Sequence, residues 1–72
     1  MKFEHLKYFV EIAHCSSINK AAKNLFISQP TLTSAIQSLE KDLGFQLLKR
    51  SRQGVALTEK GAKVFFDAEK IL

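Results

Sequence analysis

The sequence predicts a mainly α-helical domain: a first helix, two further helices joined by a short turn, then a small β-hairpin and a last helix. Three observations support this prediction. Apolar residues recur at helical spacing on both sides of Phe26-Ile27, so only a few residues separate two helical patterns. Two short apolar runs then flank a polar turn containing Gly54, which is typical of a hairpin. With 46% hydrophobic residues, the 72-residue chain is expected to form one small domain with a packed core.

Composition and charge limit the classes of partner and compartment. The formal net charge is +4 and the pI about 9.5, which favours a polyanionic partner but is too modest to establish one. The single cysteine, Cys15, cannot form an internal disulfide, as expected in a reducing compartment. No apolar run approaches the roughly 20 residues that cross a bilayer, and no signal-peptide pattern opens the chain. We therefore expect a cytoplasmic protein without a membrane partner.

The first helix is expected from residue 2 to about residue 14. Its predicted apolar stripe consists of Phe3, Leu6, Val10 and Ala13, widened by Phe9. We expect this helix to be mostly core. His5 and His14 have no cysteine pair or carboxylate at metal-ligand spacing, so no metal site is predicted and both are expected on the surface.

The second helix is predicted over about 18–25, with Ser16 or Ser17 as its N-cap. Its apolar positions are Ile18, Ala21, Ala22 and Leu25. The paired alanines would let a neighbouring helix approach closely. With the helix that follows, this segment outlines a helix-turn-helix over about 18–37. A generic helical hairpin in a core is the alternative interpretation.

The third helix is predicted over about 29–43. Ser28 is a suitable N-cap, and Pro30 falls in the first turn, where no intrahelical N–H is needed. Gly44 supplies the C-terminal stop. The apolar stripe runs through Leu32, Ile36, Leu39 and Leu43.

The opposite face of this third helix carries the functional prediction. With a rotation of about 100° per residue, the residues that point away from the apolar stripe are Pro30, Thr33, Ser34, Gln37 and Lys41. The first two turns bear short hydroxyls and amides, with no carboxylate before Glu40. Such side chains can bond to base edges and phosphates, whereas carboxylates are repelled by a polyanion. An ordinary solvated helix face is the alternative.

The hairpin is expected to pair a run over 45–50 with a run over 55–57. Two strands alone are marginal in water, so the hairpin must pack on the helices. Its tip is predicted to carry Lys49, Arg50 and Arg52 as a basic cluster. Phosphate or minor-groove contact is the favoured interpretation, and a solvated turn is the alternative.

The last helix is expected after Thr58 as N-cap, with Glu59 in its first turn. Gly61 is a poor helix former, and a close approach to a neighbouring helix would explain it. Apolar residues cover more than one face of this helix: Ala62, Val64, Phe65, Phe66, Ala68, Ile71 and Leu72. This surplus indicates a helix of another subunit or a further domain as partner. A helix that stops without a C-cap is expected in a piece of a longer chain or an isolated domain.

No catalytic set can be assembled from these residues. His14 and Cys15 are adjacent, but nothing indicates a nucleophile with an oriented base, and Cys15 is expected to be a small core or boundary residue. There is no glycine-rich phosphate loop. Neither an enzyme nor a cofactor is predicted.

One ordered set of residues spans the chain in register and without a gap. It consists of Leu6, Phe9, Ala13, Ser17, Ala21-Ala22, Leu25, Ser28-Gln29-Pro30-Thr31-Leu32-Thr33, Ile36, Leu39-Glu40, Leu43-Gly44, Leu47, Arg50, Leu57-Thr58-Glu59 and Gly61. This set resembles the N-terminal DNA-binding domain of LysR-type bacterial transcriptional regulators.

The resemblance implies a winged helix-turn-helix over 1–57, in which the hairpin over about 45–57 is the wing. It also implies that 58–72 begin a linker helix that pairs two subunits. The implied function is sequence-specific binding of double-stranded DNA, with the third helix in the major groove and the wing on the backbone or minor groove. A homodimer would bind a partly palindromic operator. A small-molecule effector would bind only through a C-terminal domain outside these residues.

The resemblance also assigns roles to individual residues. The implied DNA-binding residues are Ser28, Gln29, Pro30, Thr31, Thr33, Ser34, Gln37, Arg50 and Arg52. The basic cluster of the hairpin adds Lys49 as a predicted phosphate contact. From the surplus of apolar residues on the last helix, we predict Phe65, Phe66, Ala68 and Leu72 as dimerisation residues. Many family members have Arg in place of Ser34 and a basic residue in place of Ser38. The third helix is therefore expected to read a less guanine-dependent site, or to rely more on the wing and on DNA shape.

Two further departures are expected to be tolerated. Leu48 stands where Phe is usual, and Lys60 where Ala is usual. A rival function also remains open, because winged-helix domains can serve as dimerisation or docking modules. In that case the apolar last helix would be the functional surface.

Overall fold

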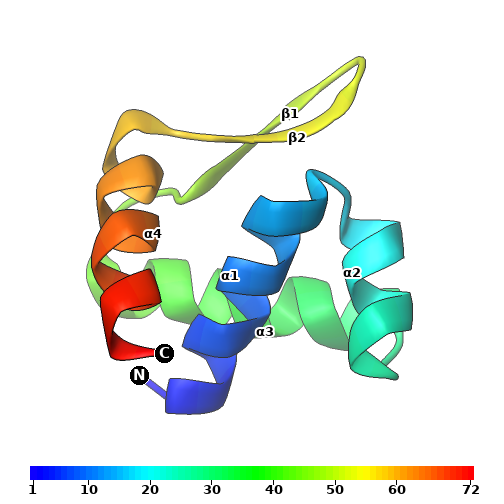
Figure 1. Cartoon of the computed structure of the whole chain (residues 1–72), viewed down its shortest axis with the longest axis horizontal. Helices are drawn as coiled ribbons and strands as arrows, with labels where there is room; N and C mark the ends of the chain where they lie inside the picture. Colours follow the sequence, from blue (N-terminus) through cyan, green and yellow to red (C-terminus); the bar gives the residue numbers. More distant parts are fainter.

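The computed structural model describes all 72 residues and contains four helices and one two-stranded antiparallel sheet (Figure 1). The elements are α1 (Phe3–Cys15), α2 (Ile18–Leu25), α3 (Gln29–Leu43), β1 (Leu48–Ser51), β2 (Gly54–Leu57) and α4 (Glu59–Ile71). The predicted mainly α-helical fold is confirmed. The first strand begins at Leu48 rather than at Phe45. No helix combines the length and the apolar character needed to cross a membrane.

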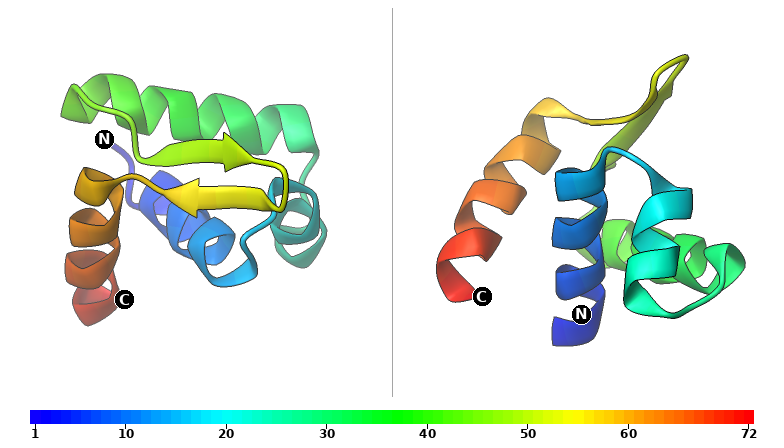
Figure 2. Two further views of the ribbon diagram at one scale, coloured as in Figure 1. Left: turned by 90° about the horizontal axis from the view of Figure 1, so that it is seen from above. Right: turned by 45° about the vertical axis from the view of Figure 1, so that its right-hand side comes forward.

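Helix α1 is the central element of the fold. It lies between α2 and α4 and also packs against α3, which crosses behind it (Figure 1). The hairpin runs alongside α3, on the side where α1 ends and α2 begins (Figure 2). Its strands pair in the register Leu48 with Leu57 through Ser51 with Gly54, which leaves a two-residue loop, Arg52-Gln53. The hairpin therefore lies beside α3 and packs on the helices, as predicted.

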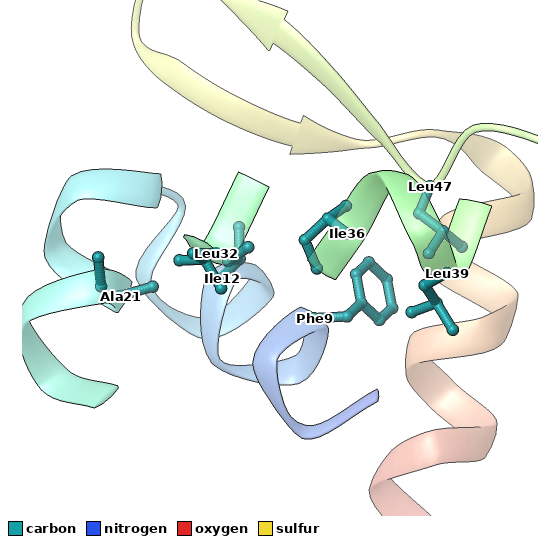
Figure 3. Close-up of a cluster of buried hydrophobic side chains, with 8 residues drawn as sticks. Phe9, Ile12, Ala21, Leu32, Ile36, Leu39 and Leu47 are labelled. Atoms are coloured by element: carbon teal, nitrogen blue, oxygen red, sulfur yellow. The ribbon is translucent and has the colours of Figure 1, made fainter. Parts of the chain in front are cut away.

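The core lies where α1, α2, α3 and the start of the wing meet (Figure 3). Its fully buried side chains include Phe9, Ile12, Leu32, Leu39 and Leu47. The stripe predicted for α1 was partly wrong. Phe9 and Ile12 form its buried face because α1 is enclosed by three helices, whereas Phe3, at the edge of the domain, is 58% exposed.

Three predicted N-caps are confirmed. Ser17, Ser28 and Thr58 each accept a hydrogen bond from a backbone N–H in the first turn of the helix that follows. Ser16 instead ends α1 in the left-handed conformation, which settles the choice between the two serines. Gly44 ends α3 with a φ of 84°, as expected for a C-terminal glycine. The boundaries of the helix-turn-helix therefore follow from local hydrogen bonding.

A group of hydrogen bonds, which we call the joint, connects the start of the wing to α3 and α4. One carboxylate oxygen of Glu40, near the end of α3, accepts from the N–H of Leu47 at 2.7 Å and from that of Leu48 at 3.4 Å. The hydroxyl of Thr58 donates to the carbonyl of Gln46 at 2.6 Å and accepts from the N–H of Gly61. These bonds hold the backbone of 46–48 against α3 and α4 where the first strand begins.

Gly61 lies too close to another segment for a side chain to fit, as predicted, but that segment is not a helix. A Cβ atom at this position would lie 2.1 Å from the carbonyl oxygen of Leu47, in the joint. At the other end of the hairpin, the N–H of Val55 donates to the carbonyl of Ser16 at 3.2 Å. Gly54 lies against the same carbonyl, since a Cβ there would be 2.5 Å from it. The wing is thus held at both ends by backbone contacts.

Candidate nucleic-acid interface

The polar face of α3 forms a protruding surface that we call the recognition ridge. It comprises Gln29, Pro30, Thr33, Ser34 and Gln37. Four of these side chains are exposed, and that of Thr33 is partly buried. The buried residues of α3, such as Leu32, Ile36 and Leu39, lie on the opposite side of the helix. The ridge is therefore available to a partner along its whole length.

A groove lies on each side of the ridge. The first, of about 510 Å³, separates α3 from α1 and is bordered by His5, Tyr8, Ser34 and Ser38 among others. The second, of about 130 Å³, separates α3 from the wing. The structure thus makes α3 a projecting helix with space on both flanks, which is the shape required to enter a groove of a nucleic acid.

The second groove brings together residues that the sequence analysis placed in separate motifs. Thr33 and Gln37 of the ridge border it on one side, and Arg50 of β1 borders it on the other. Ile18, the first residue of α2, and Glu40, near the end of α3, also line this groove, together with apolar side chains of α3 and the hairpin. The ridge, the wing and the start of α2 therefore belong to one continuous surface.

Hydrogen bonds fix the first turn of the ridge. The oxygen of the Ser28 hydroxyl accepts from the N–H of Thr31 at 3.2 Å, and the same hydroxyl donates to the Thr31 side-chain oxygen at 2.8 Å. Ser28 thus serves mainly as a cap, although it is exposed. Since its oxygen accepts this bond, the Thr31 hydroxyl keeps its own hydrogen available to a partner.

Gln29 is held by a residue that the sequence analysis missed. Its Nε2 atom donates to the Oδ1 atom of Asn19, in the first turn of α2, at 3.0 Å. Both side chains are exposed. The one signal in the sequence was an uncharged amide on the outer face of α2, where Lys20 and Lys23 are the other polar neighbours. This signal alone could not show that the two amides meet.

The predicted basic cluster is present on the wing, but only part of it lies at the tip. Lys49 and Arg50 project from β1, and Arg52 is in the turn. All three are exposed. The N-terminal ammonium pairs with Asp42, and the Nε2 atom of His14 lies 2.8 Å from a carboxylate oxygen of Glu69. No lysine or arginine side chain is paired with a carboxylate.

Most carboxylates lie away from this surface, but Glu4 lines the first groove and Glu40 lines the second. The seven acidic residues lie on α1, in the last two turns of α3, and on α4: Glu4, Glu11, Glu40, Asp42, Glu59, Asp67 and Glu69. None lies between residues 12 and 39 or between 43 and 58, whereas these segments contain Lys20, Lys23 and the wing cations. Because the wing carries cations and no carboxylate, its charge favours an anionic partner on that side.

The residues predicted to pair subunits are placed unequally. Phe66 is 61% exposed and Leu72 48% exposed, whereas Ala68 is only 2% exposed. Phe65 is partly buried and meets the ring of His14 edge to face, with centroids 5.3 Å apart. Ala68 therefore packs within its own chain, and the surface that α4 offers to a partner comes from Phe66, Leu72 and the exposed Ile71.

A second polar cluster lies apart from the ridge, between α1 and α2. A carboxylate oxygen of Glu11 accepts from Asn24 at 2.9 Å and from the thiol of Cys15 at 3.2 Å. The bond from Asn24 is the main cause that lowers the pKa of Glu11. Burial, followed by the neighbouring Glu11, raises the pKa of Cys15, so this thiol is not activated.

The helix-turn-helix, the flanking hairpin and the projecting ridge define the class of winged helix-turn-helix proteins. A family model described as "Bacterial regulatory helix-turn-helix protein, lysR family" matches residues 3–62. The chain therefore belongs to the LysR family, as its resemblance predicted.

Curated relatives and solved structures agree with this assignment. The chain is 46% identical over all 72 residues to the HTH-type transcriptional regulator TcbR of Pseudomonas sp. (strain P51), of which it covers 24%. It is similar to the crystal structure of a CbnR DBD–DNA complex, with a TM-score of 0.93 and 45% identity over 99% of this chain and 82% of that one. A BenM DBD/catB site 1 DNA complex matches with a TM-score of 0.93 and 42% identity, over 99% of this chain and 76% of that one. The chain thus spans about a quarter of the length of the curated relative it matches.

Proposed function

We propose that this chain binds double-stranded DNA sequence-specifically, as the DNA-binding domain of a bacterial transcriptional regulator. The observation that carries the proposal is the second groove, where Thr33 and Gln37 of the ridge face Arg50 of the wing. One surface therefore combines uncharged hydrogen-bonding groups with unpaired cations. The DNA-bound domains of CbnR and BenM, to which the chain is similar, support the same function.

The ridge and the wing would have different roles on DNA. An α-helix fits the major groove, where amides and hydroxyls can bond to base edges. We therefore assign Gln29, Thr31, Thr33, Ser34 and Gln37 to direct readout, with Pro30 in apolar contact and Ser28 as the cap of this helix. Lys49, Arg50 and Arg52 would contact phosphates or the minor groove.

The same proposal covers oligomeric state and cellular context. Two copies would pair through α4, placing two recognition helices on a partly palindromic operator. The exposed Phe66 and Leu72 support this arrangement. Any small-molecule effector would bind a further domain, and the chain would act in the bacterial cytoplasm by binding alone, without catalysis. In this division, residues 1–57 bind DNA and 58–72 begin the pairing helix.

A binding selection tests the proposed function directly. The 72-residue chain would be used to select duplexes from a randomised pool, and its affinity for the selected and scrambled duplexes would then be compared while half-site spacing is varied. We expect one sequence and one spacing to be preferred. Equal binding to every duplex, or no binding, would contradict sequence-specific recognition.

An alternative function, a protein-docking or dimerisation module, is favoured by one observation. Exposed apolar side chains gather at the free end of α4 and at the start of α1: Met1, Phe3, Phe66, Ile71 and Leu72. A module of this kind would associate through apolar contacts that salt does not weaken. An oligomer that forms equally well at all salt concentrations and ignores DNA would support it over the proposed function.

A further inference from the structure

The hydrogen bond between Asn19 and Gln29 joins the two helices of the helix-turn-helix at their exposed edge. Asn19 is the second residue of α2, and Gln29 is the first residue of α3. The Nε2 atom of Gln29 donates to the Oδ1 atom of Asn19 at 3.0 Å. No other side-chain hydrogen bond connects α2 to α3. The amide of Gln29 is therefore tied directly to α2 by this bond.

This bond restricts what Gln29 can present to a partner. A primary amide has two N–H donors and one carbonyl acceptor. One N–H is used by Asn19, so one N–H and the Oε1 atom remain. An unrestrained Gln at an exposed helix start would sample several rotamers and could exchange the positions of its donor and acceptor. In the structure the oxygen of Asn19 receives this N–H, so the bond favours one orientation of the Gln29 amide.

We infer that Asn19 is a positioning residue that holds Gln29 as an adjacent donor–acceptor pair suited to adenine. In the major groove adenine offers an acceptor at N7 and a donor at N6, which a Gln amide can bind together. Guanine offers two acceptors at the same edge and matches this pair less well. The inference rests on the proposed function and adds a base preference and a residue outside the assigned site.

The position of Asn19 is consistent with this role. It lies in the first turn of α2, after the cap Ser17, and its side chain is exposed on the side where α3 begins. The bond to Gln29 is the one side-chain hydrogen bond that Asn19 makes. No carboxylate lies in α2 or in the first two turns of α3.

Asn24 provides a matched control within the same helix. It is also an exposed α2 asparagine whose side chain bonds to another helix, since its Nδ2 atom donates to Glu11 of α1 at 2.9 Å. Replacing it removes an interhelical amide bond of similar length at a site away from the ridge. Any effect shared by Asn19→Ala and Asn24→Ala therefore reports on the fold rather than on Gln29.

The test uses the 72-residue chain and duplexes selected by it from a randomised pool. Comparing the wild type with Gln29→Ala identifies the base pair that Gln29 reads. At this pair we expect adenine to be preferred, and 7-deazaadenine, which lacks the N7 acceptor, to weaken binding of the wild type but not of Gln29→Ala. Asn19→Ala should reduce the preference at this pair about three- to tenfold, leave the preference at other pairs unchanged, and have no effect in the Gln29→Ala background.

A conservative variant tests the orientation of the bond. Asn19→Asp keeps an oxygen that can accept from Gln29, so it should retain the adenine preference while the added charge weakens binding to all duplexes alike. Loss of the preference in Asn19→Asp would overturn the proposed orientation. A uniform loss of affinity in Asn19→Ala, at every base pair, would also overturn the inference, because Asn19 would then act as a phosphate contact.

The failures of the inference and of the proposed function can be distinguished. If the chain selects a sequence but Asn19→Ala and Asn24→Ala have the same profile as the wild type, the positioning role is wrong and the proposed function stands. The same conclusion holds if Gln29 reads a base other than adenine. If the chain selects no sequence, the proposed function fails and the inference fails with it.

Discussion

The ridge of α3 and the wing lie on one surface but are built in opposite ways. In the first turn of α3, Gln29 of the ridge is bonded to Asn19 and the neighbouring Thr31 is bonded to Ser28, so these uncharged groups have preferred directions. On the wing, Lys49, Arg50 and Arg52 are charged and have no carboxylate partner. Directional hydrogen bonds distinguish bases, whereas free cations attract any phosphate. The difference assigns selectivity to the ridge and sequence-independent affinity to the wing.

The largest expected effect comes from breaking the joint that holds these two regions together. In Gly61→Ala the new Cβ would lie 2.1 Å from the carbonyl oxygen of Leu47, which is backbone and cannot turn aside. We expect the free energy of unfolding to fall by about 2 kcal/mol or more, although Ala gains about 1 kcal/mol over Gly in a helix. Chemical denaturation followed by circular dichroism measures this change. Lys63→Ala, at an exposed site in the same helix, is the control and should change stability little.

Removing the main amide of the ridge should affect selectivity without affecting the fold. Gln29→Ala is expected to reduce discrimination at one base pair by about 1–3 kcal/mol, because the base then lacks its directional partner. Competition between the selected duplex and its single-base variants measures this loss, and the melting temperature serves as the check on folding. If the variant keeps every base preference, Gln29 has no role in readout.

Removing a wing cation should affect affinity without affecting selectivity. Arg52 lies in the wing turn and has no ion-pair partner. Arg52→Ala is expected to weaken binding to selected and scrambled duplexes by the same factor, and to flatten the dependence of log affinity on log salt by about one unit. Arg52→Lys keeps the charge and should keep the slope. A loss confined to the selected duplex would mean that the wing reads sequence.

The smallest effect is expected in the cluster around Glu11, which lies outside both regions. The bond from Asn24 lowers the pKa of Glu11, so its stabilisation is present above the unfolded pKa and is lost as pH falls through the folded pKa. Asn24→Ala should raise the pKa of Glu11 towards its ordinary value and remove this acid-sensitive stabilisation, which at an exposed site is worth at most about 0.5 kcal/mol.

An NMR titration of Glu11 and unfolding curves across acidic pH measure the two effects of Asn24→Ala. DNA selectivity should remain that of the wild type, because the cluster does not touch the ridge. A changed base preference in this variant would show that the two sides of α2 are coupled.

The elements of both regions could be predicted from the sequence because their signals are local. Ser28, Pro30 and Gly44 fix the ends of α3 through hydrogen bonds and dihedral angles within a few residues. The stripe from Leu32 to Leu43 fixes which face is buried, and hence which face forms the ridge. The hairpin was equally evident from its two apolar runs.

Features that depend on how the elements pack could not be predicted. The bond between Asn19 and Gln29 depends on the angle at which α2 and α3 pack, and no local sequence pattern specifies that angle. Gly61 was correctly linked to a close approach, but its neighbour is the loop carbonyl of Leu47 rather than a helix. Ala68 belonged to an apolar set that covers two faces of α4, and only the structure shows that it packs inward.

The most direct test of the division between ridge and wing is the ratio of affinities for the selected and scrambled duplexes, measured between about 50 and 200 mM salt. If cations of the wing bind phosphates and uncharged groups of the ridge read bases, both affinities fall with the same slope and their ratio stays constant. A ratio that falls towards one as salt increases would contradict this account, because selectivity would then depend on the charged contacts.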